Sequence, residues 1–161
     1  MKIYVIFISF HIAKRKHGKM EKDEDTLISE ITDEHKALII EILKIVKNSG
    51  LRIEYAELSQ KILDNYGINI NPHLGMHHAL GKISEISYKL NLPMLSVIVI
   101  SKAEQRPSQG FFELYDELHN THIKGNKYFE EKIYKQEREA VKECKDWSKL
   151  LKKLDINDID E

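Results

Sequence analysis

Eight histidines are the first residues of this 161-residue chain that could carry out chemistry. His73 and His77 are four residues apart, and His119 and His122 are three apart, which are spacings of metal ligands on one helix face. If the two pairs met in space, four imidazoles could hold an ion and support a metal-dependent enzyme. Neither pair stands in a His-Glu-x-x-His motif, and the single cysteine excludes a cysteine-rich site. Scattered surface histidines are the simpler interpretation, and we expect no metal and no other cofactor.

The other reactive side chains do not indicate an enzyme. Cys144 has lysines beside it but no positioned base, so an idle thiol is the better interpretation. Glu113, Asp116 and Glu117 could bind a divalent ion together with Glu85, as in a nuclease. The lysine motif expected beside such a site is missing, which favours a solvated helix face. The seven glycines are spread singly and form no phosphate-binding loop. We therefore predict a protein without catalytic residues.

A third set of residues has the chemistry of a nucleic-acid interface. Histidines and lysines on one edge of an expected helix could face a phosphate backbone, and the polar loop that follows could supply a wing. Only Arg106 offers the bidentate fork that reads guanine. The alternative is a solvated helix and loop. The predicted DNA-binding residues are His73, His77, His78, Lys82, Lys89, Ser101, Lys102, Gln105 and Arg106.

Three helices with apolar faces are expected to position this set. The first covers residues 33–49, where apolar residues recur at helical spacing between a threonine N-cap and a glycine stop. The second covers residues 54–66 and ends before a glycine. The third covers residues 73–90 and begins after an Asn-Pro pair, which is typical of a helix start.

The pattern changes after the third helix. Residues 94–100 are apolar and rich in β-branched side chains, which predicts a buried strand that pairs near residues 51–53. Residues 102–110 are polar and predict a loop. Three helices followed by a strand and a loop are the order of a winged helix-turn-helix. The expected fold class is thus α+β, mainly α, a winged helix-turn-helix-like core with additional C-terminal helices. Those helical segments are predicted at residues 111–119, 127–145 and 147–154.

Short motifs between residues 51 and 112 follow one another in a characteristic order. Ile53-Glu-Tyr-Ala-Glu-Leu-Ser places a strand residue and a tyrosine before a helix, and Leu74-Gly-Met-His-His-Ala-Leu-Gly-Lys is rich in small residues. A proline, a strand and a glycine loop follow. Together these motifs resemble the DNA-binding part of alkyltransferase-like proteins, which implies a winged helix-turn-helix that binds DNA. The nucleophile segment Pro-Cys-His-Arg of that family is absent, with Ser101-Lys102 near its place, so the resemblance does not extend to alkyl transfer.

Charge and chain ends complete the expectations. The 25 Lys and Arg nearly balance 26 Asp and Glu, which excludes a uniformly basic coat for nucleic acid. The lone cysteine suits the cytoplasm, and the apolar run at residues 3–12 is too short to cross a membrane. This run favours a strand, with a misassigned start before Met20 as the alternative. We expect a single domain at residues 32–154, between an N-terminal extension at 1–31 and an acidic tail at 155–161.

These observations favour a non-enzymatic DNA-binding module whose partner is double-stranded DNA. The resemblance further suggests a regulator or a recognition component of a bacterial defence or phage system. A protein-interaction module on the same scaffold is the alternative, for example a phage-encoded inhibitor of a bacterial defence nuclease. A histidine-based metal-dependent enzyme is the second alternative.

Overall fold

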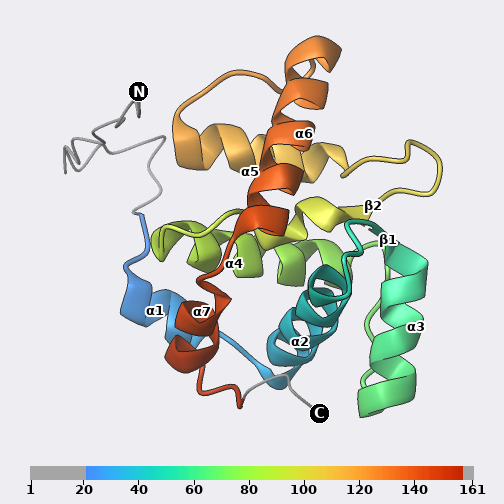
Figure 1. Cartoon of the computed structure of the whole chain (residues 1–161), viewed down its shortest axis with the longest axis vertical. Coiled ribbons are helices and arrows are strands. Elements are labelled where there is room, and N and C mark those ends of the chain that lie inside the picture. Colours follow the sequence, from blue (N-terminus) through green and yellow to red (C-terminus); the bar gives the residue numbers. More distant parts are fainter. Residues whose placement is uncertain (1–20, 158–161) are drawn as a thin grey trace.

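Helix α4 (Gly75–Lys89) lies at the centre of the fold, and four other elements pack against it (Figure 1). The structure is a computed structural model that describes residues 21–157. The elements in contact with α4 are helices α1 (Glu24–Ser29), α2 (Asp33–Lys47) and α5 (Gln109–His119) and the 3-10 helix η1 (Leu95–Ile98). The remaining elements are strands β1 (Ile53–Glu54) and β2 (Val99–Ile100) and helices α3 (Tyr55–Tyr66), α6 (Lys127–Glu143) and α7 (Trp147–Lys153).

Helix α4 can occupy this position because every residue from 79 to 89 is buried or half-buried. Met76, Ile83 and Ile86 have no exposed surface. The buried hydroxyl of Ser84 donates a hydrogen bond of 2.6 Å to Ser96 Oγ, so this polar group is satisfied inside the core. A helix with no exposed residue along most of its length has neighbours on several sides, which is the central place that α4 occupies.

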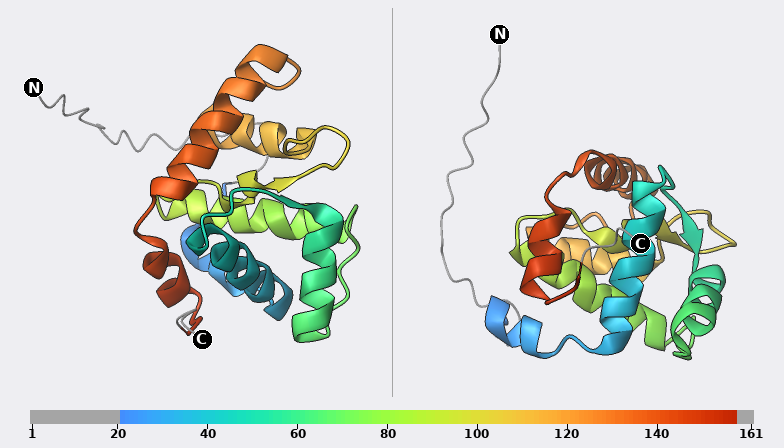
Figure 2. Two further views of the ribbon diagram at one scale, coloured as in Figure 1. Left: turned by 45° about the vertical axis from the view of Figure 1, so that its right-hand side comes forward. Right: turned by 60° about the horizontal axis from the view of Figure 1, so that its bottom comes forward.

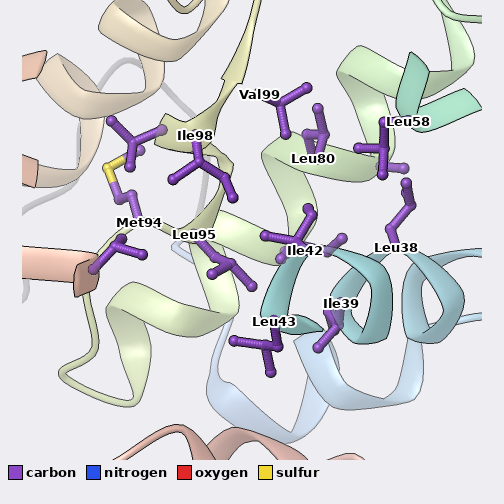
Figure 3. Close-up of a cluster of buried hydrophobic side chains, with 14 of the residues drawn as sticks. Leu38, Ile39, Ile42, Leu43, Leu58, Leu80, Met94, Leu95, Ile98 and Val99 are labelled. Carbon is purple, nitrogen blue, oxygen red and sulfur yellow. The ribbon is translucent and has the colours of Figure 1, made fainter. Parts of the chain in front are cut away.

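The core joins α2, α3 and α4 to the segment that contains η1 and β2. Figure 3 shows buried side chains of α2 opposite those of α3, α4 and the η1–β2 segment. All of these residues belong to one continuous hydrophobic cluster. The labelled side chains are Leu38, Ile39, Ile42, Leu43, Leu58, Leu80, Met94, Leu95, Ile98 and Val99.

The sheet has two short strands, and they run parallel. Ile53 pairs with Val99, and Glu54 pairs with Ile100. Because the strands are parallel, both end at the same edge of the sheet, where α3 begins after β1 and a loop leaves β2. This edge positions the candidate site described below.

The expected α+β class with mainly helical content is confirmed, but the predicted strand at residues 94–100 is wrong in extent. Only Val99 and Ile100 are strand, and η1 precedes them, with the N–H of Val97 donating to the Met94 carbonyl at 3.1 Å. The segment is buried on every side between α4 and α6, so its continuous apolar run fits a buried turn as well as a strand. Among the described residues, no β-hairpin follows α4.

The predicted helices occur, and three of them, α3, α4 and α5, start one or two residues away from the expected position. The third helix was expected from residue 73, but α4 begins at Gly75. The Asn71 side-chain Oδ1 accepts hydrogen bonds from the N–H groups of His73 and Leu74 at 2.9 and 3.1 Å. This Asx turn keeps residues 72–74 outside the helix.

The folded unit extends into the segment that was expected to precede the domain. Leu27 of α1 is fully buried in the core, so residues 21–31 are part of the fold. At the other end, α7 returns toward α1 (Figure 2). Lys153 Nζ lies 2.6 Å from Glu24 Oε1. The strand expected at residues 3–12 and the end of the acidic tail lie outside the described residues. No helix within residues 21–157 is both long enough and apolar enough to span a membrane.

Candidate nucleic-acid interface

The starts of three helices meet at the edge of the sheet where both strands end. Tyr55 opens α3, His77 lies in the first turn of α4, and Ser108 is the N-cap of α5. The Tyr55 hydroxyl donates to Ser108 Oγ at 3.2 Å, and Ser108 Oγ lies 3.4 Å from His77 Nδ1. The rings of Tyr55 and His77 are 4.9 Å apart between centroids. These contacts join the start of α4 to the end of the loop that follows β2.

Three exposed histidines, His73, His77 and His78, form one side of this surface, and we name them the histidine trio. Leu74 lies among them and is also exposed. Partial burial, and then the neighbouring charges of His73 and His78, lower the pKa of His77 below its ordinary value. His73 and His78 therefore lie close enough to His77 to affect its protonation.

The other side is the polar loop, residues 101–108, which extends away from the body between β2 and α5 (Figure 1). Its backbone is closed on itself, because the N–H of Ser101 donates to the Arg106 carbonyl at 2.9 Å and the N–H of Gln105 donates to the Ser101 carbonyl at 2.8 Å. Lys102 and Gln105 are exposed on it. Internal hydrogen bonds of this kind give the loop a defined shape without a second strand.

The Arg106 side chain packs against α5 and α6 and is not part of the exposed surface of the loop. Its Nη2 lies 2.9 Å from Oε2 of Glu130, a carboxylate only 1% exposed, and the guanidinium lies over the Phe112 ring. Burial acts to raise the pKa of Glu130, but hydrogen bonds from the N–H of Gly125 and from Arg106 hold it below its ordinary value. We therefore correct the expected role of Arg106 from reading guanine to anchoring the loop on α6.

Lys82 and Lys89 are likewise engaged within the fold. Lys82 Nζ pairs with Glu30, and Lys89 Nζ pairs with Glu21. Hydrogen bonds from Lys22 and Lys82 lower the pKa of Glu30 to about 2, so this carboxylate stays charged in the folded protein. Residues at both ends of α1 thus hold two of the predicted DNA-binding lysines, and α1 lies toward the other end of α4 from the polar loop (Figures 1 and 2).

The two histidine pairs do not form a metal site. His119 stacks on the Tyr115 ring with centroids 3.9 Å apart, and its Nδ1 lies 3.0 Å from the Tyr115 carbonyl. Within residues 21–157, no group of three His, Cys, Asp or Glu side chains is arranged to hold an ion. The four imidazoles considered from the sequence, His73, His77, His119 and His122, are therefore not brought together.

Asp116, a member of the acidic triplet, and Cys144 both lie in surroundings that do not favour a catalytic role. Asp116 accepts hydrogen bonds from Thr121 Oγ1 and from the N–H groups of Ile123 and Lys124, at 2.6 to 2.9 Å. These hydrogen bonds hold the segment that connects α5 to α6 against the Asp116 carboxylate. Burial raises the pKa of Cys144, which opposes formation of a reactive thiolate.

Sequence reasoning missed Ser108, and it noted Tyr55 only as part of a motif. A usable signal for Ser108 was present, because a serine directly after a proline and before an apolar helical run is typical of an N-cap. The contact between Tyr55 and Ser108 joins residues 53 positions apart. No local pattern could indicate that contact.

No protein-family model, curated protein or solved structure matches this chain.

Proposed function

We propose that this protein is a non-enzymatic DNA-binding module of winged-helix type that contacts double-stranded DNA through the histidine trio and the polar loop. The observation that supports the proposal most is the chain of contacts from Tyr55 through Ser108 to His77, which makes the start of α4 and the loop one surface. In this assignment α4 is the recognition helix and the polar loop takes the place of the wing. A regulator or a recognition component of a bacterial defence or phage system would use such a module.

The chemistry of the surface suits phosphate groups better than base edges. Backbone N–H groups at helix starts carry partial positive charge and bind phosphate oxygens, and exposed histidines and Lys102 add side-chain donors. The Arg106 guanidinium is held by Glu130, and the Gln105 amide donates to the Lys102 carbonyl at 2.9 Å. We therefore expect binding dominated by the DNA backbone, with small differences in affinity between duplex sequences.

The proposal is tested by measuring binding of a labelled 20-base-pair duplex by fluorescence anisotropy at several salt concentrations. We expect Lys102→Ala combined with Gln105→Ala to raise Kd about fivefold, or about 1 kcal/mol. The slope of log Kd against the logarithm of the salt concentration should fall by about 1, because one phosphate contact is lost.

A matched control changes the same residue types elsewhere on the surface. Lys145→Ala combined with Gln136→Ala also removes one lysine and one glutamine, both exposed and outside the proposed interface. This variant should bind like the wild type. Equal weakening by the two double variants would contradict the proposed surface, and no binding by the wild type at low salt would contradict the function.

A protein-binding module is the second candidate, and a separate observation favours it. Tyr128 and Phe129 at the start of α6 are 72% and 45% exposed, and their rings contact each other edge to face. Exposed aromatic side chains are common at the centres of protein interfaces. If the duplex does not bind, an inhibitor of a bacterial nuclease that uses this end of α6 becomes the favoured function.

A further inference from the structure

The positive charges expected at the DNA surface fall into two groups, and this division has a consequence for binding. Lys82, Lys89 and Arg106 are paired with carboxylates of the fold. The groups left on the surface are Lys102 and the histidine trio, and an ordinary histidine is only about one-tenth charged at pH 7.5. Most of the charge that this surface can offer to phosphate therefore depends on protonation.

We propose that binding of DNA phosphate by this protein is coupled to protonation of the histidine trio, so that affinity for duplex DNA rises as the pH falls from about 8 to about 6. This inference rests on the proposed function. It adds the condition under which the surface becomes positively charged.

The surroundings of His77 fix the direction of the effect. His73 and His78 face it from its own segment, Tyr55 faces it from α3, and Ser108 faces it from the polar loop. The charged residues of the polar loop are Lys102, Glu104 and Arg106, of which Glu104 and Arg106 pair with each other at 3.6 Å.

Protonation is unfavourable in the free protein and favourable in the complex. Burial and the neighbouring histidines lower the pKa of His77, so that it is mostly neutral near pH 7. A phosphate diester beside the trio brings a negative charge, which raises the pKa of each nearby imidazole. The complex then holds more protons than the free protein and the free DNA together, and by linkage its formation is favoured at lower pH.

The hydrogen bonds of Ser108 support the same direction. A hydroxyl has one donor and two acceptor positions, and the Tyr55 hydroxyl already occupies one acceptor position of Ser108. When His77 Nδ1 is unprotonated, the Ser108 hydroxyl donates to it. When Nδ1 is protonated, it donates to Ser108 Oγ, and the Ser108 hydroxyl hydrogen is released to donate to a phosphate oxygen. Protonation of the His77 imidazole thus frees one further donor, the Ser108 hydroxyl, for a phosphate oxygen.

The test compares duplex affinity at pH 5.5, 6.5, 7.5 and 8.5 at constant ionic strength. The variant His73→Gln combined with His78→Gln removes two members of the trio, and His119→Gln combined with His122→Gln is the matched control. For the wild type and the control, we expect Kd to rise at least tenfold from pH 6.5 to 8.5. For the trio variant, the rise should be less than threefold.

Each other outcome overturns the inference in a distinguishable way. Wild-type binding that does not change with pH, or a trio variant that follows the wild-type curve, contradicts proton coupling but leaves DNA binding intact. Absence of binding at every pH contradicts the proposed function and the inference together. NMR titration of the histidine ring signals with and without duplex gives a second measurement, in which bound DNA should raise the pKa of His77.

Discussion

Arg106 contacts three parts of the fold: Glu104 in its own loop, Glu130 of α6 and the ring of Phe112 of α5. The guanidinium side chain is 16% exposed, and the Glu130 side chain is 1% exposed. Charges removed from water in this way are stable only when each has a partner with good geometry. We therefore expect the polar loop to keep its shape only while the Arg106–Glu130 ion pair is intact.

At the scale of single residues, we predict that Arg106→Ala lowers the free energy of unfolding by about 3 to 5 kcal/mol. The change leaves the Glu130 carboxylate buried without its partner, which is the costly half of a broken ion pair. Urea denaturation measures the loss. The double variant Arg106→Met with Glu130→Met should lose less than Arg106→Ala, because no buried charge remains. A loss below about 0.5 kcal/mol for Arg106→Ala would show that the pair does not anchor the loop.

At the scale of elements, the start of α2 depends on one imidazole. The N–H of Thr32 donates to His35 Nδ1 at 2.9 Å, and Thr32 Oγ1 lies 2.7 Å from the same nitrogen. Burial, and then the charge of Lys82, lower the pKa of His35 below its ordinary value. A protonated Nδ1 cannot accept the hydrogen bond, so this cap requires neutral histidine.

The pH dependence of stability should therefore include a contribution from His35. Because folding lowers its pKa, the unfolded chain binds the proton more tightly, and the stabilisation is present above about pH 6.5 and lost as the pH falls below it. We expect His35→Gln, which keeps an acceptor at this position, to reduce the loss of stability between pH 7.5 and pH 5 by about 1 kcal/mol. Denaturation of both proteins at the two pH values tests this, and identical losses would contradict the capping role.

The helices were predictable because apolar spacing and end signals agree in each of them, as at residues 33–47 and 55–66. The strand predicted at residues 94–100 was too long, because complete burial removes the alternation of apolar and polar residues that distinguishes a strand from a turn. The start of α4 was misplaced because the Asn71 side chain closes a turn outside the helix. In each case a tertiary or side-chain interaction decided between local structures that the sequence allows equally.

At the scale of the whole molecule, charge pairing between distant segments decides which cations remain at the surface. Glu30 and Glu21 lie 52 and 68 residues from Lys82 and Lys89, their partners, so the pairing could not be predicted from local sequence. The histidine trio and the polar loop were both included in the predicted interface. Their contact through Tyr55 and Ser108 became visible only in the folded chain.

The proposed DNA surface is tested most directly by NMR of the ¹⁵N-labelled protein during titration with a 20-base-pair duplex at pH 6. We expect the largest shifts in the backbone N–H signals of residues 73–78 and 101–108, with those of α7 nearly unchanged. The shifts should decrease as salt is added, because the contacts are to phosphate. Shifts centred on α7 or on the start of α6, or no shifts at low salt, would contradict the assignment of this surface to DNA.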